Sequence, residues 1–229
     1  MKKIITLIIV SILSVTMLPA QPGYGRGGYY GGPGGPSRHG RGYERHRHSH
    51  DNNLYAGIKA GLTASHISSG TGEINASGIK NGVSLGLATG FNISPFAAFE
   101  SGLYYVEKGG IGDVSGGKVT YDLHYLELPL LLKINIFSGR QAFFQPYAGA
   151  YLGMGVGGKI KDYRTQIYAS SFNDANIRRG DSGLAIGCGV TWSFLHANLG
   201  YEYGLSDISK NGFGDNRNRA LILSVGFAF

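Results

Sequence analysis

Eight ionisable side chains occupy positions from which they could pair with one another inside a folded domain. Four are cations and four are carboxylates: Lys59, Lys108, Lys133, Arg179, Glu100, Glu127, Asp181 and Glu202. Each falls on the polar face of a segment in which apolar and polar residues alternate. An unpaired buried charge costs several kcal/mol, so the equal numbers favour a structural network of ion pairs and trapped water. A narrow path for ions or protons is the alternative use of the same residues.

A second group of charges lies between residues 158 and 178, where Lys159, Lys161 and Arg164 stand close together. Cations gathered in a polar connection attract phosphates and carboxylates. We therefore predict an anion-contacting loop at these three residues.

The run His46, His48 and His50 could place three imidazoles on one side of an extended chain, as Zn, Cu or Ni ions require. The surrounding segment is rich in Gly and Arg and offers no second shell of ligands. We therefore expect a solvated tether here, with no metal and no cofactor.

The remaining histidines are His66, His124 and His196. A lipid-facing His124 beside a serine and a carboxylate could deacylate a lipid. The chain has no Gly-x-Ser-x-Gly stretch, and the sequence alone assigns no serine to the neighbourhood of His124. We therefore expect a protein without catalytic residues.

The chain divides into three parts that differ in composition. Residues 1–20 have a basic start, an apolar stretch and the small residue Ala20, as in a cleaved secretory signal. Residues 21–53 contain ten Gly but no Leu, Ile, Val, Phe or Met, so this segment cannot bury a core and should be flexible. Residues 54–229 form the folded domain.

The formal charge of +7 is spread over these parts as +2, +3 and +2. The folded part is therefore nearly balanced, which argues against binding to nucleic acid. The single Cys188 excludes an intramolecular disulfide and a cysteine-based zinc site.

A period of two predicts eight strands in the folded part. Their ranges are 54–65, 81–91, 96–108, 119–134, 143–157, 179–192, 197–205 and 218–229. Short connections such as 92–95 and 193–196 alternate with long ones such as 66–80 and 158–178. This alternation is typical of an all-β, up-and-down antiparallel barrel with long loops at one end and tight turns at the other.

The apolar face of the strands distinguishes two barrels of this layout, because a soluble lipocalin-like barrel turns it inward and a membrane barrel turns it outward. In the last strand Leu221, Leu223, Val225, Phe227 and Phe229 share one face, and the opposite face is small and polar. A soluble ligand-binding barrel would hardly line its cavity with glycine and carboxylates while its outside is apolar. We therefore expect the apolar face to contact lipid.

Aromatic residues are sorted by level along the predicted strands. One group lies near the short turns or the C-terminus: Phe91, Phe96, Phe143, Phe144, Trp192, Phe194 and Phe229. Tyr104, Tyr105 and Tyr121 gather at the opposite ends. Two such levels predict two aromatic girdles, one at each membrane interface.

Several stretches resemble the PorT-like, porin family outer-membrane β-barrel proteins, which share the eight-stranded architecture of OmpA and OmpX. The most specific is the fourth-strand motif, Tyr125-Leu126-Glu127-Leu128-Pro129-Leu130-Leu131-Leu132-Lys133. The start of the domain (54–62), residues 100–105 and 146–152, and the terminal Phe229 also match. The resemblance covers residues 54–229 and implies a fold and a location, with no shared catalytic residues to carry over.

These inferences together predict a monomeric outer-membrane barrel of a Gram-negative cell, with residues 21–53 in the periplasm. The expected role is structural, or one of surface interaction through the long loops, with lipid and lipopolysaccharide as partners and Phe229 as the contact to the barrel-assembly machinery. A component of protein secretion or a narrow channel is the alternative, and a soluble lipocalin-like binder is a second one.

Overall fold

The computed structural model describes residues 54–69, 76–114, 117–137, 142–163, 167–172, 177–210 and 215–228. The predictions for the signal, the 21–53 segment, the three histidines at 46, 48 and 50, Arg164 and Phe229 concern residues outside these ranges. No helix among the described residues is long and apolar enough to cross a membrane.

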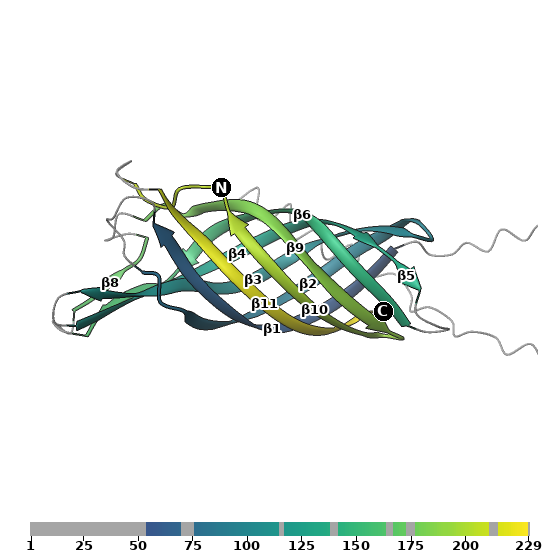
Figure 1. Ribbon diagram of the computed structural model, residues 1–229, viewed down its shortest axis with the longest axis horizontal. Coiled ribbons are helices and arrows are strands. Elements are labelled where there is room, and N and C mark those ends of the chain that lie inside the picture. Colours follow the sequence, from purple (N-terminus) through teal and green to yellow (C-terminus); the bar gives the residue numbers. More distant parts are fainter. Residues whose placement is uncertain are drawn as a thin grey trace, which may run out of the picture. The chain divides into compact units, whose positions relative to one another are not determined.

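Eleven β-strands make up the described part of the chain (Figure 1). They are β1 (Leu54–Ser69), β2 (Lys80–Ser94), β3 (Ala97–Val114), β4 (Gly117–Ile134), β5 (Ile136–Phe137), β6 (Ala142–Gly157), β7 (Lys159–Asp162), β8 (Ile167–Ser170), β9 (Gly180–Trp192), β10 (Leu195–Gly204) and β11 (Asn216–Ala228).

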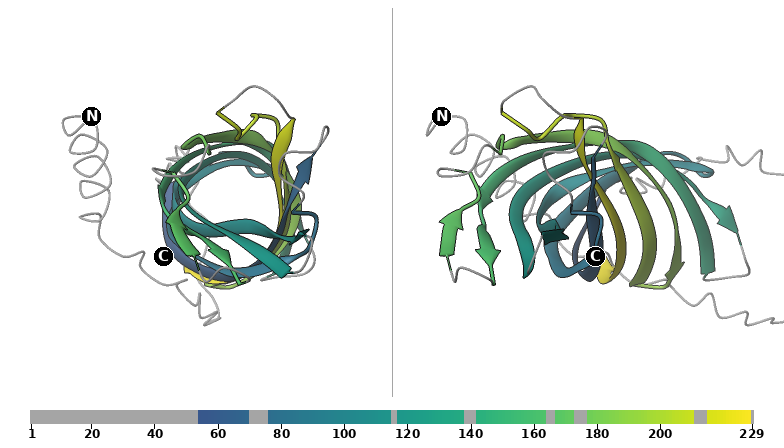
Figure 2. Two further views of the ribbon diagram at one scale, coloured as in Figure 1. Left: turned by 90° about the vertical axis from the view of Figure 1, so that its left-hand side faces the viewer. Right: turned by 60° about the vertical axis from the view of Figure 1, so that its left-hand side comes forward.

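Eight of these strands close into an antiparallel barrel, which Figure 2 shows end-on. The order around the ring is β1, β2, β3, β4, β6, β9, β10 and β11. Each strand of the ring therefore pairs with the ring strands that come before and after it in the sequence. The ring closes where β11 pairs with β1, from Gly57 opposite Ala228 to Ser69 opposite Asn216. The predicted all-β, eight-stranded up-and-down barrel is therefore confirmed.

Strand pairing extends further at the long-loop end than the sequence predicts. The connections 109–118 and 158–178 were expected to be loops, but β3 and β4 remain paired up to Val114 and Gly117, and β7 and β8 form a hairpin. The start of β4 pairs with β7 between Val119 and Tyr121. Alternation is hard to recognise here because glycine carries no side chain to mark a face.

Two glycines mark the place where these extensions leave the ring. Gly109 and Gly158 have φ angles of +142° and +145°, which L side chains rarely adopt. A Cβ at Gly109 would collide with the carbonyl oxygen of Tyr121, and one at Gly158 with that of Asp122. Both glycines thus allow β3 and the β7 end to pass close to the same stretch of β4.

The outer face of the barrel is apolar, as the alternation predicts. On β11 Leu221, Leu223, Val225 and Phe227 are 45 to 62% exposed, while Ala220 on the other face is 1% exposed. The same arrangement holds on β2 and β9, where Leu85 and Ile186 face outward. A soluble lipocalin-like barrel has the reverse arrangement, so this outer face argues against that alternative.

The described residues include the predicted aromatic girdle at the short-turn end, but the three tyrosines predicted for the second girdle do not share the outer face. At the short-turn end Phe91, Phe96, Phe144, Trp192 and Phe194 are exposed on the outer face. At the other end Tyr105 faces outward, but Tyr104 lines the barrel interior and Tyr121 packs against buried residues there. Their closeness along the sequence conceals that adjacent strand residues point to opposite faces.

Inward-facing tyrosines fill much of the cross-section, and glycines make room for them. A Cβ at Gly86 or Gly102 would overlap the ring of Tyr104. A Cβ at Gly187 would overlap the ring of Tyr147 in the same way. An eight-stranded barrel is just wide enough for side chains to fill, and these pairs show how the filling is achieved.

The apolar outer face gives a first prediction. Leu223→Arg, in the middle of the apolar stretch of β11, should lower the free energy of unfolding in lipid vesicles by about 2–4 kcal/mol. Asn81→Arg, outward-facing and beyond the apolar stretch of β2, should cost about 1 kcal/mol or less. Urea unfolding of both variants in phospholipid vesicles measures the difference, and equal effects would contradict a lipid-facing surface.

Candidate functional site

The barrel interior holds the first candidate site, and its lower part is a three-residue ion network near the short turns. Glu100 on β3 accepts from Lys59 on β1 and from Lys133 on β4, each at 2.6 Å. Tyr55 donates from its hydroxyl to Glu100 Oε2 at 3.1 Å. One carboxylate therefore contacts two ammonium groups, one on the adjacent strand β4 and one on β1, two strands away on the other side.

A second network surrounds Lys108, which is completely buried. Its Nζ lies 2.6 Å from Glu127 Oε1 on β4, 2.6 Å from Glu202 Oε2 on β10 and 3.7 Å from Asp181 Oδ2 on β9. The ammonium also lies 4.1 Å from the centre of the Tyr151 ring. One cation thus links strands from opposite sides of the ring across the interior.

Neutral side chains complete the surroundings of Asp181. Its carboxylate accepts from the Nδ2 of Asn218 at 3.0 Å and from the hydroxyl of Ser206 at 3.1 Å. Asn218 donates in addition to the hydroxyl of Tyr125 at 3.2 Å. The buried carboxylate is therefore held by hydrogen bonds as well as by charge.

Seven of the eight charged residues singled out in the sequence lie in these two networks, and Arg179 lies elsewhere. The Arg179 side chain is exposed, donates to the carbonyl oxygen of Gly155 at 2.9 Å and lies 5.5 Å from the Phe172 ring centre. Because Arg179 precedes β9, the alternation of that strand does not fix its direction.

A chain of neutral hydrogen bonds crosses the interior at the short-turn end. Gln145 donates to Asn135 at 2.8 Å and accepts from Thr191 at 2.6 Å, and the Thr191 hydroxyl lies 2.8 Å from His196 Nδ1. His196 was expected in a tight turn, but β10 begins at Leu195, so its ring points into the barrel. Its role here is to complete this chain.

A cavity of about 80 Å³ separates the two ion networks. Lys59 and Glu100 line it on one side, Glu127 and Glu202 on the other, and the buried Asn198 adds its amide. The Asn198 Nδ2 has no hydrogen-bond partner among the described residues. Its polar walls and a size that suits about five water molecules make trapped water the natural content.

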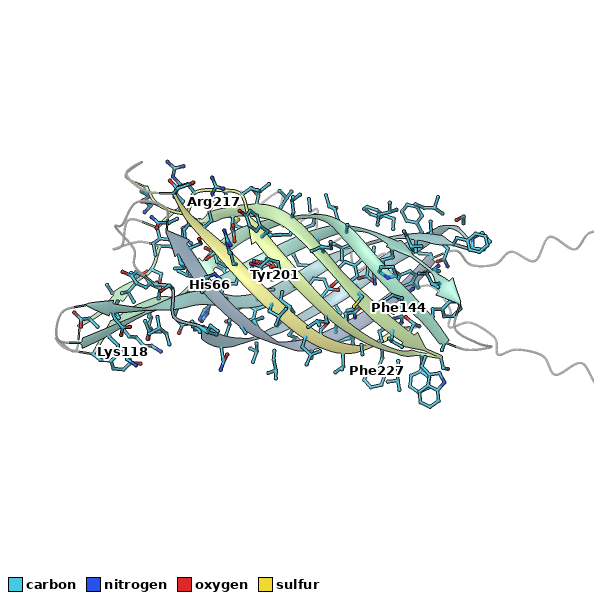
Figure 3. All side chains as sticks on the ribbon, in the orientation of Figure 1. His66, Lys118, Phe144, Tyr201, Arg217 and Phe227 are labelled. Carbon is cyan, nitrogen blue, oxygen red and sulfur yellow. The ribbon has the colours of Figure 1, made fainter. Side chains whose placement is uncertain are left out.

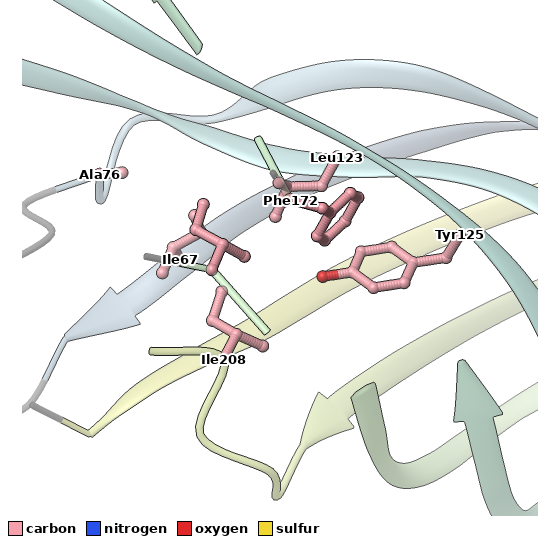
Figure 4. Close-up of a cluster of buried hydrophobic side chains, with 7 residues drawn as sticks. Ile67, Ala76, Leu123, Tyr125, Phe172 and Ile208 are labelled. Carbon is pink, nitrogen blue, oxygen red and sulfur yellow. The ribbon is translucent and has the colours of Figure 1, made fainter. Parts of the chain in front are cut away.

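An apolar plug closes the interior at the long-loop end (Figure 4). We use this name for the cluster of Ile67, Ala76, Leu123, Tyr125, Phe172, Ile177 and Ile208. Ile67, Leu123 and Tyr125 come from strands β1 and β4, and the others come from the connections between strands. Folded-in loop segments thus cover the Lys108 network from above.

A third cluster lies at the long-loop end, where β2, β4 and β7 meet. Asp122 Oδ1 lies 2.8 Å from Lys80 Nζ and 3.4 Å from His124 Nε2, and Asp122 Oδ2 lies 3.5 Å from Lys161 Nζ. His124 Nδ1 lies 2.8 Å from the hydroxyl of Tyr105. The neighbours of His124 are therefore a phenol and a carboxylate that two lysines already engage.

The residues of the predicted anion-contacting loop do not share one environment. Lys159 is exposed, whereas Lys161 pairs with Asp122. Both belong to β7, so the residues stand on a strand rather than in an irregular loop. Arg164 lies outside the described residues.

Several residues of these clusters were missed by the sequence analysis. Lys80 stands at the end of the predicted connection 66–80, and Asp122 stands near the start of the predicted strand 119–134. The sequence pattern gives neither residue a partner. Tyr55, Tyr125 and Asn218 could have been found from their inward alternation, which they share with Lys59, Glu127 and Ala220.

Comparison with known proteins gives a family and a set of similar folds. A family model described as an outer membrane protein beta-barrel domain matches residues 43–210. Comparison with curated protein sequences gives no match.

Three of the similar solved structures illustrate the likeness. Ail, the attachment invasion locus protein of Yersinia pestis, is 15% identical over 76% of this chain and 98% of its own, with a TM-score of 0.43. Neisserial surface protein A is 15% identical over 77% and 97%, with a TM-score of 0.42. OprG from Pseudomonas aeruginosa is 14% identical over 76% and 95%, with a TM-score of 0.43.

The Lys108 network gives a second prediction. Lys108→Met leaves the buried Glu127 and Asp181 and the largely buried Glu202 without their cation, and it should lower the free energy of unfolding by about 3–5 kcal/mol. Arg217→Gln, which removes an exposed pair with Asp215, should change it by less than about 1 kcal/mol.

Denaturant unfolding in detergent micelles measures both changes. Adding Glu127→Gln and Glu202→Gln to Lys108→Met should restore part of the loss, because two of the unbalanced charges are then removed. A Lys108→Met protein as stable as the parent would show that the network contributes nothing.

Proposed function

Since the chain belongs to the outer membrane protein β-barrel domain family, we propose that it is a closed, non-enzymatic membrane anchor that presents its long-loop end to partners outside the cell. The observation that carries this proposal is the filling of the barrel interior by paired charges and by the apolar plug. The inward-facing charges pair with one another in two ion networks, and the apolar plug covers the Lys108 network. Such an interior supports a structural role for the charges.

A narrow channel is less well supported by the same geometry. An ion that entered the interior would have to displace Lys108, whose Nζ lies within 2.6 Å of two carboxylates, or part the apolar plug. Breaking a buried pair of this kind costs several kcal/mol. The cavity between the networks is better suited to trapped water than to a path.

Two paired hairpins favour the long-loop end as the interacting surface. The β3–β4 and β7–β8 hairpins extend the sheet at this end, and paired strands hold side chains in place better than a loop does. Lys159 and Lys161, together with Arg164, would supply the contact to phosphates of lipopolysaccharide or to an acidic protein.

The proposed orientation follows from the strand count. With eight strands both ends of the barrel chain lie at the short-turn end, where Leu54 pairs with Phe91 and Ala228 pairs with Gly57. We propose that residues 1–20 direct export, that 21–53 lie in the periplasm, and that Phe229 is read during barrel assembly. The long-loop end would then face outward, and the protein would act as a monomer.

The PorT-like motif at residues 125–133 supports a second role, as a component of protein secretion. Tyr125, Glu127 and Lys133 of this strand are buried in the barrel interior. Packing inside the barrel therefore also explains why the motif contains these residues. The secretion role predicts that loss of the protein reduces the export of a defined set of other proteins.

A third prediction tests directly whether the filled interior blocks ions. The purified full chain, reconstituted in planar lipid bilayers, should give no discrete conductance steps, because no continuous path passes the Lys108 network and the apolar plug. Glu127→Gln should give none either. Regular conductance steps in the parent protein that change size in Glu127→Gln would support the channel in place of the anchor.

A fourth prediction concerns the β7 surface. Reversing the charges of Lys159, Lys161 and Arg164 to Glu should reduce binding of phosphorylated lipopolysaccharide core oligosaccharide by at least about tenfold, because attraction becomes repulsion. Arg217→Gln, on another strand and already paired with Asp215, is the control. Calorimetric titration measures the affinity, and unchanged binding by the triple variant would remove the proposed contact.

A further inference from the structure

A separate polar site lies on the outer face of β1, β10 and β11, where the apolar surface ends. On β11 the outward residues Leu221, Leu223, Val225 and Phe227 are followed in the direction of the long loops by Arg219. His66 on β1 and Tyr203 on β10 are its direct partners across the strands. Figure 3 shows His66 and Arg217 toward one end of the barrel and Phe144 and Phe227 toward the other.

Arg219 is held in place by Tyr203. The guanidinium carbon lies 4.5 Å from the centre of the Tyr203 ring, and Nη2 donates to the Tyr203 hydroxyl at 3.3 Å. The guanidinium thus lies over an aromatic side chain at the border between apolar and polar surface. Tyrosine favours this level of a membrane protein, because its ring is apolar and its hydroxyl is polar.

Arg219 has no acidic partner among the described residues, and unlike the exposed Lys118 and Lys159 it also has a buried side-chain nitrogen. Lys80 and Lys161 pair with Asp122, and Arg217 pairs with Asp215 at 2.9 Å. Arg219 forms no ion pair with any described residue, and its Nε is buried without a hydrogen-bond partner there. A buried donor without a partner is costly, so this group calls for an acceptor from outside the chain.

The position next to Arg219 favours an anion over a neutral acceptor. His66 stands directly opposite in the strand pair, with its Cβ about 5 Å from that of Arg219, and its imidazole supplies a further N–H donor. A planar guanidinium presents several N–H groups in a fixed fork that matches the oxygens of a phosphate.

We propose that Arg219, His66 and Tyr203 bind a phosphate group of a phosphorylated glycolipid of the lipid A type. The acyl chains of this lipid would lie along Leu221 and Leu223, directly below the cation on the same face. Its headgroup phosphate would then stand at the level of Arg219. Phosphates at this depth belong to lipid headgroups, and the choice of glycolipid rests on the proposed outward orientation of the long-loop end.

The test is a titration of the purified full chain in zwitterionic detergent, followed by native mass spectrometry. The probes are bis-phosphorylated lipid A, the same lipid with its phosphates removed, and phosphatidylglycerol. The parent protein should bind the phosphorylated lipid A about tenfold more tightly than the dephosphorylated form, and Arg219→Gln should lose this preference. Lys118→Gln removes an exposed charge elsewhere at the long-loop end and should keep the preference.

A second variant keeps the test valid if Arg219→Gln does not fold. His66→Glu places a carboxylate opposite Arg219, satisfies its charge within the protein and should abolish the preference for phosphate. Equal affinity of the parent for both forms of lipid A, or an unchanged preference in either variant, overturns the proposal. Binding of phosphatidylglycerol as tight as that of lipid A overturns the choice of glycolipid.

The outcome is separable from that of the proposed function. A cysteine introduced at Lys159 should react with a membrane-impermeant thiol reagent on intact cells if the long-loop end faces outward. Failure of this labelling would contradict the orientation, while a phosphate preference that depends on Arg219 would still be measurable in detergent.

Discussion

Closure of the sheet by the pairing of β1 with β11 is the constraint on which the other features depend. In a hydrocarbon environment every backbone N–H and C=O group must find its partner within the protein, because no water is available to replace it. The pairing from Gly57 and Ala228 to Ser69 and Asn216 removes the two edges that an open eight-stranded sheet would expose. The apolar outer face of Leu62, Leu223 and Val225 is compatible with lipid only because this ring is complete.

A ring of eight strands determines what the interior can be. Its cross-section is so narrow that inward side chains must meet those from the opposite wall, as Lys108 on β3 meets Glu202 on β10. Charges in such a place are tolerated where each lies against groups of the opposite sign, and Glu100 between Lys59 and Lys133 shows the same rule with the signs exchanged. Packing and ion pairing therefore fill the interior that a wider barrel would leave open, and interactions with other molecules are left to the outer face and to the long-loop end.

The alternation of side chains made the ring and most of its interior predictable from sequence. It assigned Lys59, Glu100, Lys108 and Glu127 to one face, because a strand reverses side-chain direction at every residue. It could not assign Arg179, which precedes its strand, and closeness along the sequence wrongly grouped Tyr104 and Tyr121 with Tyr105. The apolar plug was also beyond reach, since Phe172, Ile177 and Ile208 come from connections whose folding depends on the barrel beneath them. The same holds for the Lys80–Asp122 pair, in which the Lys80 side chain passes close to Gly109 of the intervening strand β3.

The most direct test of the account is outer-membrane fractionation combined with gel mobility before and after boiling. A closed barrel whose ring of hydrogen bonds resists detergent should be found in the outer-membrane fraction and should migrate differently before and after boiling. A soluble periplasmic protein whose mobility does not depend on boiling would contradict the membrane barrel on which every other conclusion rests.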